Sequence, residues 1–527
     1  MQLKNKLVPT LKSKQLPGAL ADIYAAAVLV WFPWCANGYL KIAQTKLAAF
    51  LGITVLTGAV LAVVVPEKYD TSHRKRQGIV AVVYAAVTLV STLLSGNFAA
   101  ALWGSGGYLG GLVLTAAALL GCMGTAVFLK NPAALCLPFI ISGAGVALLG
   151  VLNNFGVDPL GFRAAIRPEQ YNLFFSTIGN ADYLSAFLCL WLPLAAHRFA
   201  VSARAGEQWT VFACAEIGFL GMASLDSGMT ALGLAGAAFV LLLFVPLTVL
   251  ELSRYAMLAA GWTAAQFAIG VLAAKYPLLR TEHPFAALGK PAVAAVIVAV
   301  CLLAAAVFAA LAKSTQGKTC LLAQRIVCGA AAVGCAVLLV LANAYDVSFG
   351  GLDNFLRFGP DWATGRGAIW ADVWYCFTHG TPLQMLFGNG PGMVHAVLAT
   401  AGDALPYNLT DTIGAHNEYL ELLLTTGLAG LAAYLAFVGM TLHTATKQMQ
   451  DEPQKCGLLF CAVAYLVQAF FNNRVTAVFP IFMVLLGVLT AEPDGDKEHS
   501  AGRMLVALVL TVVGALGGSL LLHALFL

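Results

Sequence analysis

The amino-acid sequence predicts an all-α, polytopic transmembrane helical bundle of about 12–15 spans, with one large loop on the outer face that contains amphipathic helices. Of the 527 residues, 60% are hydrophobic and only 10% are charged, whereas a soluble globular protein carries about 25% charged residues. The apolar runs extend without alternation to about 20 residues, which is the length that a helix needs to cross a bilayer. Because backbone polar groups in lipid must be satisfied internally, and these runs do not alternate, we expect helices and not a barrel.

We place the spans at apolar runs that are bounded by polar residues. In chain order these runs are 19–37, 46–66, 79–96, 109–129, 133–153, 177–196, 209–224, 229–250, 255–275, 291–312, 326–345, 417–442, 456–472, 475–490 and 504–526. The basic start, MQLKNKLVPTLKSKQLPG, leads into a full span, so we expect no cleavable signal peptide.

The distribution of Lys and Arg predicts the orientation. With a cytoplasmic N-terminus, the inner segments hold 19 of the 29 Lys and Arg residues, as the positive-inside rule requires. We therefore divide the chain into N-terminal transmembrane helices (1–153), central transmembrane helices with an outer loop at 154–176 (154–345), a large extracytoplasmic loop (346–416), C-terminal helices (417–490), and a cytoplasmic linker with the last span (491–527). An outer loop as long as 346–416 is usually functional.

Composition also excludes some classes. The net charge of +4 is small and dispersed, which argues against a nucleic-acid partner. The twelve cysteines form no CxxC pair and lie mostly inside apolar runs, where they are expected to pack between helices. Three intramembrane acids, Asp22, Glu216 and Glu421, are expected to make structural hydrogen bonds to neighbouring helices.

The large loop contains the stretch RFGPDWATGRGAIWADVWYCFTHG. In it Ile369, Trp370, Val373, Trp374 and Phe377 share one helical face, which predicts an amphipathic helix lying in the membrane interface. Arg366 stands at the start of this helix, among glycines.

After this helix comes LFGNGPGMV, whose glycines permit a tight turn and close approach of the backbone to a ligand. The loop ends at His416, followed by Asn417 on the first turn of the next span. Taken alone, such a His is usually a capping residue, and a single outer Arg usually binds lipid headgroups. Their joint occurrence in one loop, before a helix whose Gly427 and Gly430 allow close packing, favours a functional site.

The stretch 366–437 resembles the O-antigen ligase and polymerase superfamily of bacterial membrane glycosyltransferases. The resemblance lies in GRGAIW, FGNGPG and HNEYLELLLTTGLAGLAAYL, where His416 and Gly427 reproduce the ligase pattern of a His and a Gly with ten residues between them. STIGNADYLSAFLCLWLPLA and SLDSGMTALGLAGAAF are similar to upstream segments of the family, so the resemblance covers roughly 160–490. At two places where the family often has an Arg, this chain has Phe174–Phe175 and Met229.

The resemblance implies an enzyme of the bacterial cytoplasmic membrane with its active site on the extracytoplasmic face. It would transfer a glycan from a polyprenyl-diphosphate donor to an acceptor hydroxyl on a glycan, a lipid or a protein, in surface polysaccharide assembly. His416, with a pKa near the usual value of about 6.5, would be the general base. Arg366 would be the main diphosphate ligand, because its guanidinium binds phosphate oxygens bidentately.

Further residues complete the expected site. Arg163, Arg167 and Arg474 are expected to help bind the diphosphate, and Asn180, Asp182, Asn417 and Tyr419 to line the cavity. We expect no cofactor and no metal, because the one Asp-x-Asp pair, Asp494 and Asp496, lies on the predicted cytoplasmic side.

Two alternatives belong to other functional classes. A lipid-linked oligosaccharide flippase or secondary transporter would carry functional charges at the membrane midplane and inverted repeats, and we find no repeat. A non-catalytic scaffold would tolerate loss of His416. Within the enzyme class the sequence does not separate a polymerase from a ligase.

Overall fold

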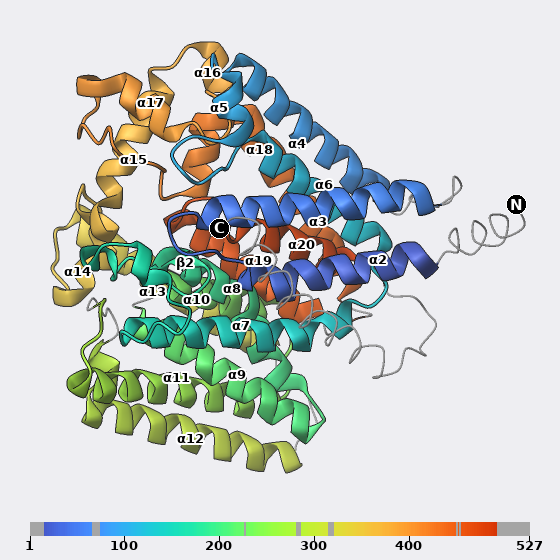
Figure 1. Cartoon of the computed structure of the whole chain (residues 1–527). Coiled ribbons are helices and arrows are strands. Elements are labelled where there is room, and N and C mark those ends of the chain that lie inside the picture. The colour runs from blue at the N-terminus through green and yellow to red at the C-terminus, as the bar shows by residue number, and fades with distance from the viewer. Residues whose placement is uncertain are drawn as a thin grey trace, which may run out of the picture.

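The computed structural model describes residues 15–65, 74–225, 228–280, 286–314, 321–449, 452 and 455–492. This part of the chain is almost entirely helical, which confirms the predicted all-α class. Its one sheet is an antiparallel hairpin of two-residue strands, β1 (Phe174–Phe175) and β2 (Gly179–Asn180). In Figure 1 the long helices run side by side across the molecule.

The long helices follow the predicted spans closely. They are α2 (Gln15–Ala26), continued by η1 (Ala27–Trp31) and η2 (Phe32–Trp34), then α3 (Ile42–Val64), α4 (Lys75–Leu94), α6 (Leu112–Phe128), α7 (Pro132–Asn154), α8 (Ala181–Val201), α9 (Ala205–Ser224), α10 (Gly228–Phe244), α11 (Val249–Lys275), α12 (Pro291–Ser314), α13 (Leu321–Ala344), α18 (Glu418–Gln448), α19 (Lys455–Gln468) with η9 (Ala469–Phe471), and α20 (Phe479–Thr490). The predicted span 504–526 lies outside the described residues.

Nine helices in the described part are long and apolar enough to cross a membrane. Four more apolar helices are shorter: Leu112–Phe128, Gly228–Phe244, Lys455–Phe471 and Phe479–Thr490. The composition and these helices together indicate a multi-pass membrane protein. The count of about fifteen spans and the predicted domain boundaries stay predictions.

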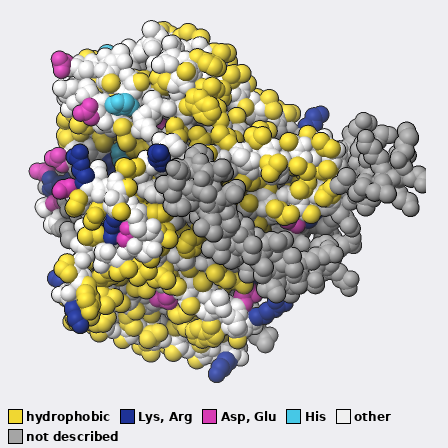
Figure 2. Space-filling view, viewed as in Figure 1, with side chains coloured by type: hydrophobic (Ala, Val, Ile, Leu, Met, Phe, Trp, Pro, Cys, Tyr) yellow, Lys and Arg dark blue, Asp and Glu magenta, His cyan; other side chains and the backbone are white. Residues whose placement is uncertain are grey.

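The core lies around α8 and α20. Every residue of α20 is buried, and α8 packs against α7, α9, α10 and α19. By contrast, only 11% of the residues in the most apolar stretch of α12 are buried inside the protein, and the share is the same for α13. Figure 2 shows hydrophobic side chains over most of the visible described surface, with many of the charged side chains near its margins. This surface suits contact with lipid.

The three intramembrane acids differ in how their oxygens are satisfied. Asp22 Oδ1 accepts hydrogen bonds from the backbone N–H groups of Lys130 and Asn131. It therefore makes the predicted type of contact, a structural hydrogen bond at the start of a neighbouring helix, α7. Glu216 Oε1 and Glu421 Oε2 are buried and have no hydrogen-bond partner among the described residues.

The loop 346–416 is an ordered group of short elements, namely η7 (Gly350–Leu352), α14 (Asp353–Leu356), α15 (Trp362–Thr378), α16 (Pro382–Phe387), α17 (Val394–Ala401) and η8 (Gly402–Ala404). They lie together at one end of the long helices, in yellow to orange at the left of Figure 1. Of these elements, α15, α16 and α17 share a small hydrophobic core that includes Val373, Phe377 and Leu398 and reaches Leu424 of α18.

This core corrects the predicted interfacial face of α15. Val373 and Phe377 are buried against the rest of the loop, and Trp370 contacts the rings of Trp362 and Phe471. Of the two tryptophans on the predicted face, Trp370 and Trp374, the exposed one is Trp374, at 53%. The apolar periodicity identified a buried face of the helix, but protein covers most of that face.

Candidate functional site

His416 lies at the turn into α18. Its φ of +47° places it in the left-handed region, which is uncommon outside glycine. Its backbone N–H donates to Asn473 Oδ1 at 2.6 Å. The next residue, Asn417, caps α18 by accepting from the N–H groups of Tyr419 and Leu420. The ring of His416 is therefore presented from a turn held at both sides.

The helix that follows is broken at Gly427, where φ is +71° and ψ is −174°. The break frees backbone carbonyls of the preceding turn, and the glycine turn of residues 387–392 satisfies them. The N–H of Asn389 donates to Leu424 O at 3.2 Å, and the N–H of Gly390 donates to Thr425 O at 2.8 Å. A side chain on Gly427 would collide with the backbone of Leu386. The glycine turn thus approaches the backbone of α18 closely.

Arg366 emerges from a left-handed turn. Ala363, Thr364 and Gly365 all have positive φ, and Arg366 Nη1 donates to Ala363 O and to Thr364 Oγ1, each at 2.8 Å. Its Nη2 forms an ion pair with Asp182 Oδ2 at 3.0 Å. The guanidinium is thus held by its own turn on one side and by the start of α8 on the other.

Two asparagines connect the parts of the site. Asn472 Nδ2 donates to the backbone O of Asp182 at 2.8 Å, while Asn473 Oδ1 accepts from the N–H of His416. Adjacent residues therefore hold the backbones of Asp182 and His416, and Asp182 pairs with Arg366. The sequence analysis did not predict a role for either asparagine. Both stand in the segment FFNNRV, where only Arg474 was singled out, and this polar pair between apolar runs was the signal that could have identified them.

The electrostatics of His416 place it among these charges. Burial of the ring, the largest cause, and then the charge of Arg366 lower the pKa of His416 to about 4, against the opposing effect of the Asp182 carboxylate. The expected pKa near 6.5 is therefore wrong for the free protein. His416 is neutral at pH 7, and its buried Nδ1 has no hydrogen-bond partner in the described part of the chain.

Arg474 lies in a different environment. Its Nε pairs with Glu418 Oε1 at 3.2 Å, its Nη1 donates to the hydroxyl of Tyr84 at 2.9 Å, and its guanidinium lies 4.0 Å from the ring centre of Phe479. Glu418 is fixed in turn by the hydroxyl of Tyr465 at 3.0 Å. With 5% of its side chain exposed, Arg474 is enclosed by Glu418, Tyr84 and Phe479, so these contacts give its predicted diphosphate role no support.

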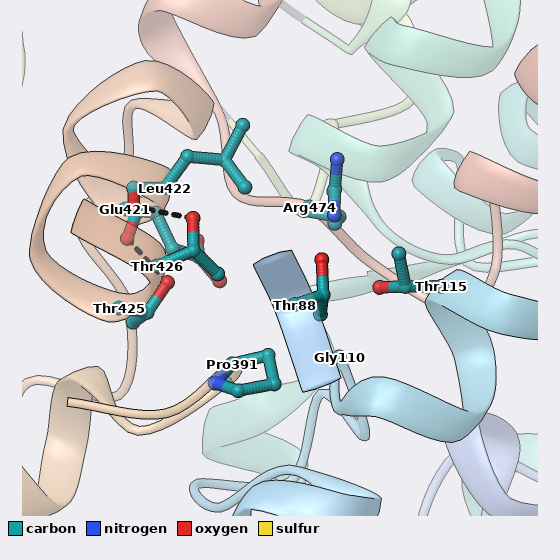
Figure 3. A pocket seen from close by; sticks show the side chains of 10 residues that line it. Thr88, Gly110, Thr115, Pro391, Glu421, Leu422, Thr425, Thr426 and Arg474 are labelled. Carbon is teal, nitrogen blue, oxygen red and sulfur yellow. Dashed lines mark hydrogen bonds between the residues drawn. The ribbon is translucent and has the colours of Figure 1, made fainter. Parts of the chain in front are cut away.

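A small polar pocket lies beside Arg474 (Figure 3). Its volume is about 10 Å³, which is room for about one water molecule. The lining side chains come from α4, α6, α18 and the glycine turn, and include Thr88, Thr115, Glu421 and Thr426. A pocket of this size holds no diphosphate, so it is not the predicted donor site.

The two arginines of the loop 154–176 lie apart from these contacts. Arg163 is buried, donates to the backbone O of Asn153, and lies over the ring of Tyr171. Arg167 is exposed at the start of η5 (Pro168–Gln170). No contact of the described residues brings either one to Arg366 or His416, so their predicted help in diphosphate binding has no geometric support.

The predicted cavity-lining residues have mainly structural contacts. Asn180 caps α8 by accepting from the N–H of Asp182 at 2.7 Å, and Asn417 caps α18. The hydroxyl of Tyr419 donates to Leu466 O at 2.7 Å. Only Asp182 directs its side chain to a predicted functional group, Arg366. Within the described ranges no three His, Cys, Asp or Glu side chains form a group that could hold a metal ion.

The arrangement joins a neutral imidazole, a guanidinium with one carboxylate partner, and two braced helix starts. A neutral imidazole can accept a proton, and a guanidinium can stabilise a developing phosphate charge. Comparison with known proteins adds no relative: no family model matches the chain, and no curated protein matches it.

Proposed function

We propose that the protein is a membrane glycosyltransferase that moves a glycan from a polyprenyl-diphosphate donor to an acceptor hydroxyl. The observation that supports the proposal most is the association of His416, Arg366 and Asp182, which come from three distant segments. The ion pair of Arg366 with Asp182 and the opposing effects of both on His416 connect them. Such a grouping of base and phosphate-binding cation is what this reaction requires.

In the proposed reaction a ring nitrogen of His416 accepts the proton of the acceptor hydroxyl. The acceptor oxygen forms a bond to the anomeric carbon while the bond from that carbon to the diphosphate oxygen breaks. The electron pair leaves with the diphosphate, where Arg366 stabilises the added charge. One direct displacement of this kind inverts the anomeric centre. The proton then passes from His416 to solvent.

The placement that goes with this proposal is the bacterial cytoplasmic membrane, with the site on the extracytoplasmic face. The hydrophobic surface and the gathering of the loops at one end of the helices support it. The excess of Lys and Arg in the predicted inner segments supports the orientation. The acceptor, and hence the choice between polymerase and ligase, is left to experiment.

The direct test is transfer in vitro from an undecaprenyl-diphosphate glycan by the purified full chain in nanodiscs. His416→Ala is expected to abolish transfer, while His379→Ala, on an exposed histidine of the same loop, is expected to preserve it. Arg366→Lys is expected to weaken donor binding, because Lys lacks the bidentate fork. Arg357→Lys, at a surface ion pair with Asp346, is its control.

Two results would overturn the proposal. Transfer at the wild-type rate by His416→Ala would remove the assigned base. Movement of the lipid-linked glycan across a vesicle membrane without any transfer would instead favour the flippase or transporter class.

A further inference from the structure

On one edge of the Arg366 guanidinium, only one of the two nitrogen atoms has a hydrogen-bond partner among the described residues. Both N–H groups of Nη1 are taken by Ala363 O and Thr364 Oγ1. On the edge that Nε and Nη2 form, Nη2 donates to Asp182 Oδ2 and lies 3.8 Å from Met229 Sδ. Nε on that same edge is buried and has no hydrogen-bond partner among the described residues. The edge formed by Nε and Nη2 is one that binds two phosphate oxygens bidentately, and Asp182 holds half of it.

Asp182 has a fixed backbone and a replaceable side-chain contact. Its N–H donates to Asn180 Oδ1 at 2.7 Å and its backbone O accepts from Asn472 at 2.8 Å. Its carboxylate has one charged partner in the described chain, Arg366, and the side chain is 17% exposed. It also stands in the first turn of α8, where the helix dipole stabilises an anion. The carboxylate can therefore leave Arg366 without losing all electrostatic support.

Asp182 and Arg366 have opposite effects on His416. The carboxylate favours the protonated imidazole, whereas the guanidinium disfavours it. A diphosphate on Arg366 would neutralise the guanidinium and release the carboxylate in the same step. Both changes favour proton acceptance by His416.

We propose that Asp182 is a positioning residue that exchanges partners when the donor binds: it yields the Nε and Nη2 edge of Arg366 to the diphosphate and then pairs with the imidazole of His416. This inference rests on the proposed function. It makes the base effective only after the donor is bound, so acceptor deprotonation is linked to the presence of a leaving group.

The exchange and a purely structural role of Asp182 predict opposite effects of its neutralisation on donor binding. If Asp182 only held Arg366 in place, its neutralisation would weaken donor binding. In the exchange, Asp182 competes with the diphosphate, so Asp182→Asn is expected to bind the donor at least threefold more tightly. The same variant is expected to lower kcat at least tenfold, because the amide stabilises an imidazolium less well than a carboxylate does.

The pH profile supplies a second readout. The acid limb of kcat/KM reports the free enzyme and that of kcat reports the donor complex. In the wild type we expect the limb of kcat at a clearly higher pH than the limb of kcat/KM. In Asp182→Asn this separation is expected to narrow. The groups facing His416 that contribute are Arg366 and Asp182.

The experiment measures binding of undecaprenyl diphosphate and transfer by the full chain in nanodiscs, for the wild type, Asp182→Asn and the surface control Asp403→Asn. Tighter binding with lower kcat in Asp182→Asn alone supports the exchange. Equal or weaker binding in Asp182→Asn, or an unchanged kcat, overturns it and leaves the proposed function standing. A wild-type protein that neither binds the diphosphate nor transfers glycan overturns both.

Discussion

The ion pair between Glu418 and Arg474 gives the sharpest prediction about how the site is held. Arg474 follows the two asparagines that hold Asp182 and His416, and Glu418 begins the helix that follows His416. We therefore expect the pair to act as a brace between α18 and the segment 472–474, and not as part of the donor site.

The magnitude follows from burial and distance. The side chains of Glu418 and Arg474 are 1% and 5% exposed, and their closest N and O atoms lie 3.2 Å apart. At an effective dielectric constant of about 20 their attraction is about 5 kcal/mol, which desolvation largely offsets. Removing one partner leaves a buried charge without a counter-ion and costs about 3–5 kcal/mol. Removing both relieves that penalty, so the double variant should be much less destabilised than the sum of the singles.

The assay is a double-mutant cycle of Glu418→Gln, Arg474→Gln and the combined variant, with the free energy of unfolding measured in mixed micelles. We expect a coupling of at least about 2 kcal/mol, whereas the surface pair of Arg357 and Asp346 should couple by at most about 1 kcal/mol. Binding of undecaprenyl diphosphate should survive in the combined variant. Additive single effects within about 0.5 kcal/mol, or equal loss of diphosphate binding in Arg474→Gln and the combined variant, would refute the reasoning.

Three further predictions concern the helix break, the base and the absence of a metal requirement. Gly427→Ala should lower the free energy of unfolding by at least about 1 kcal/mol, because φ is positive there and the added carbon meets Leu386. Its control is Gly439→Ala in the same helix, which has open space around it and should be neutral or stabilising. Equal effects of the two substitutions on the free energy of unfolding would contradict the argument. Since the pKa of His416 is lowered to about 4, and the base must be deprotonated, kcat/KM for transfer should stay level from pH 8 to pH 6 and fall only towards pH 4. A half-maximal point of kcat/KM near pH 6.5 would count against the assigned base. Transfer should continue undiminished in EDTA, and a loss that Mg²⁺ or Mn²⁺ restores would show a metal requirement.

The sequence predicted the helices well because hydrophobic length is a local property. Each apolar run from 19–37 to 475–490 falls on a helix, since a helix satisfies its backbone within the run itself. The face of α15 was harder to interpret. Periodicity identifies an apolar side but not what covers it, and the covering residues, such as Leu398, come from another part of the loop.

Arg366 and Arg474 show the same limit of sequence analysis, which does not reveal the partners that surround a residue. In sequence, Arg366 and Arg474 are both isolated cations between apolar helices, and nothing in their spacing separates them. In the structure their partners differ: Arg366 pairs with the partly exposed Asp182 at the start of α8, while Arg474 pairs with the deeply buried Glu418. That difference depends on segments far apart in the chain. Arg366 and His416 were expected together from the resemblance, whereas the partner of Arg366 was not.

The bonds between the glycine turn and α18 bear on how the site can respond to a donor. Asn389 and Gly390 bond to carbonyls of α18 next to its break, and Ser91 of α4 donates to Thr425 O at 2.8 Å. The loop and α18 are therefore joined by backbone groups, and α4 joins α18 through the Ser91 hydroxyl, in the interior, where an unpaired carbonyl is costly. Opening the whole loop would break its two backbone bonds to α18 together, whereas turning the carboxylate of Asp182 breaks one ion pair that the diphosphate replaces. The energetics thus favour a side-chain exchange at Arg366 over a movement of the loop as the step that follows donor binding.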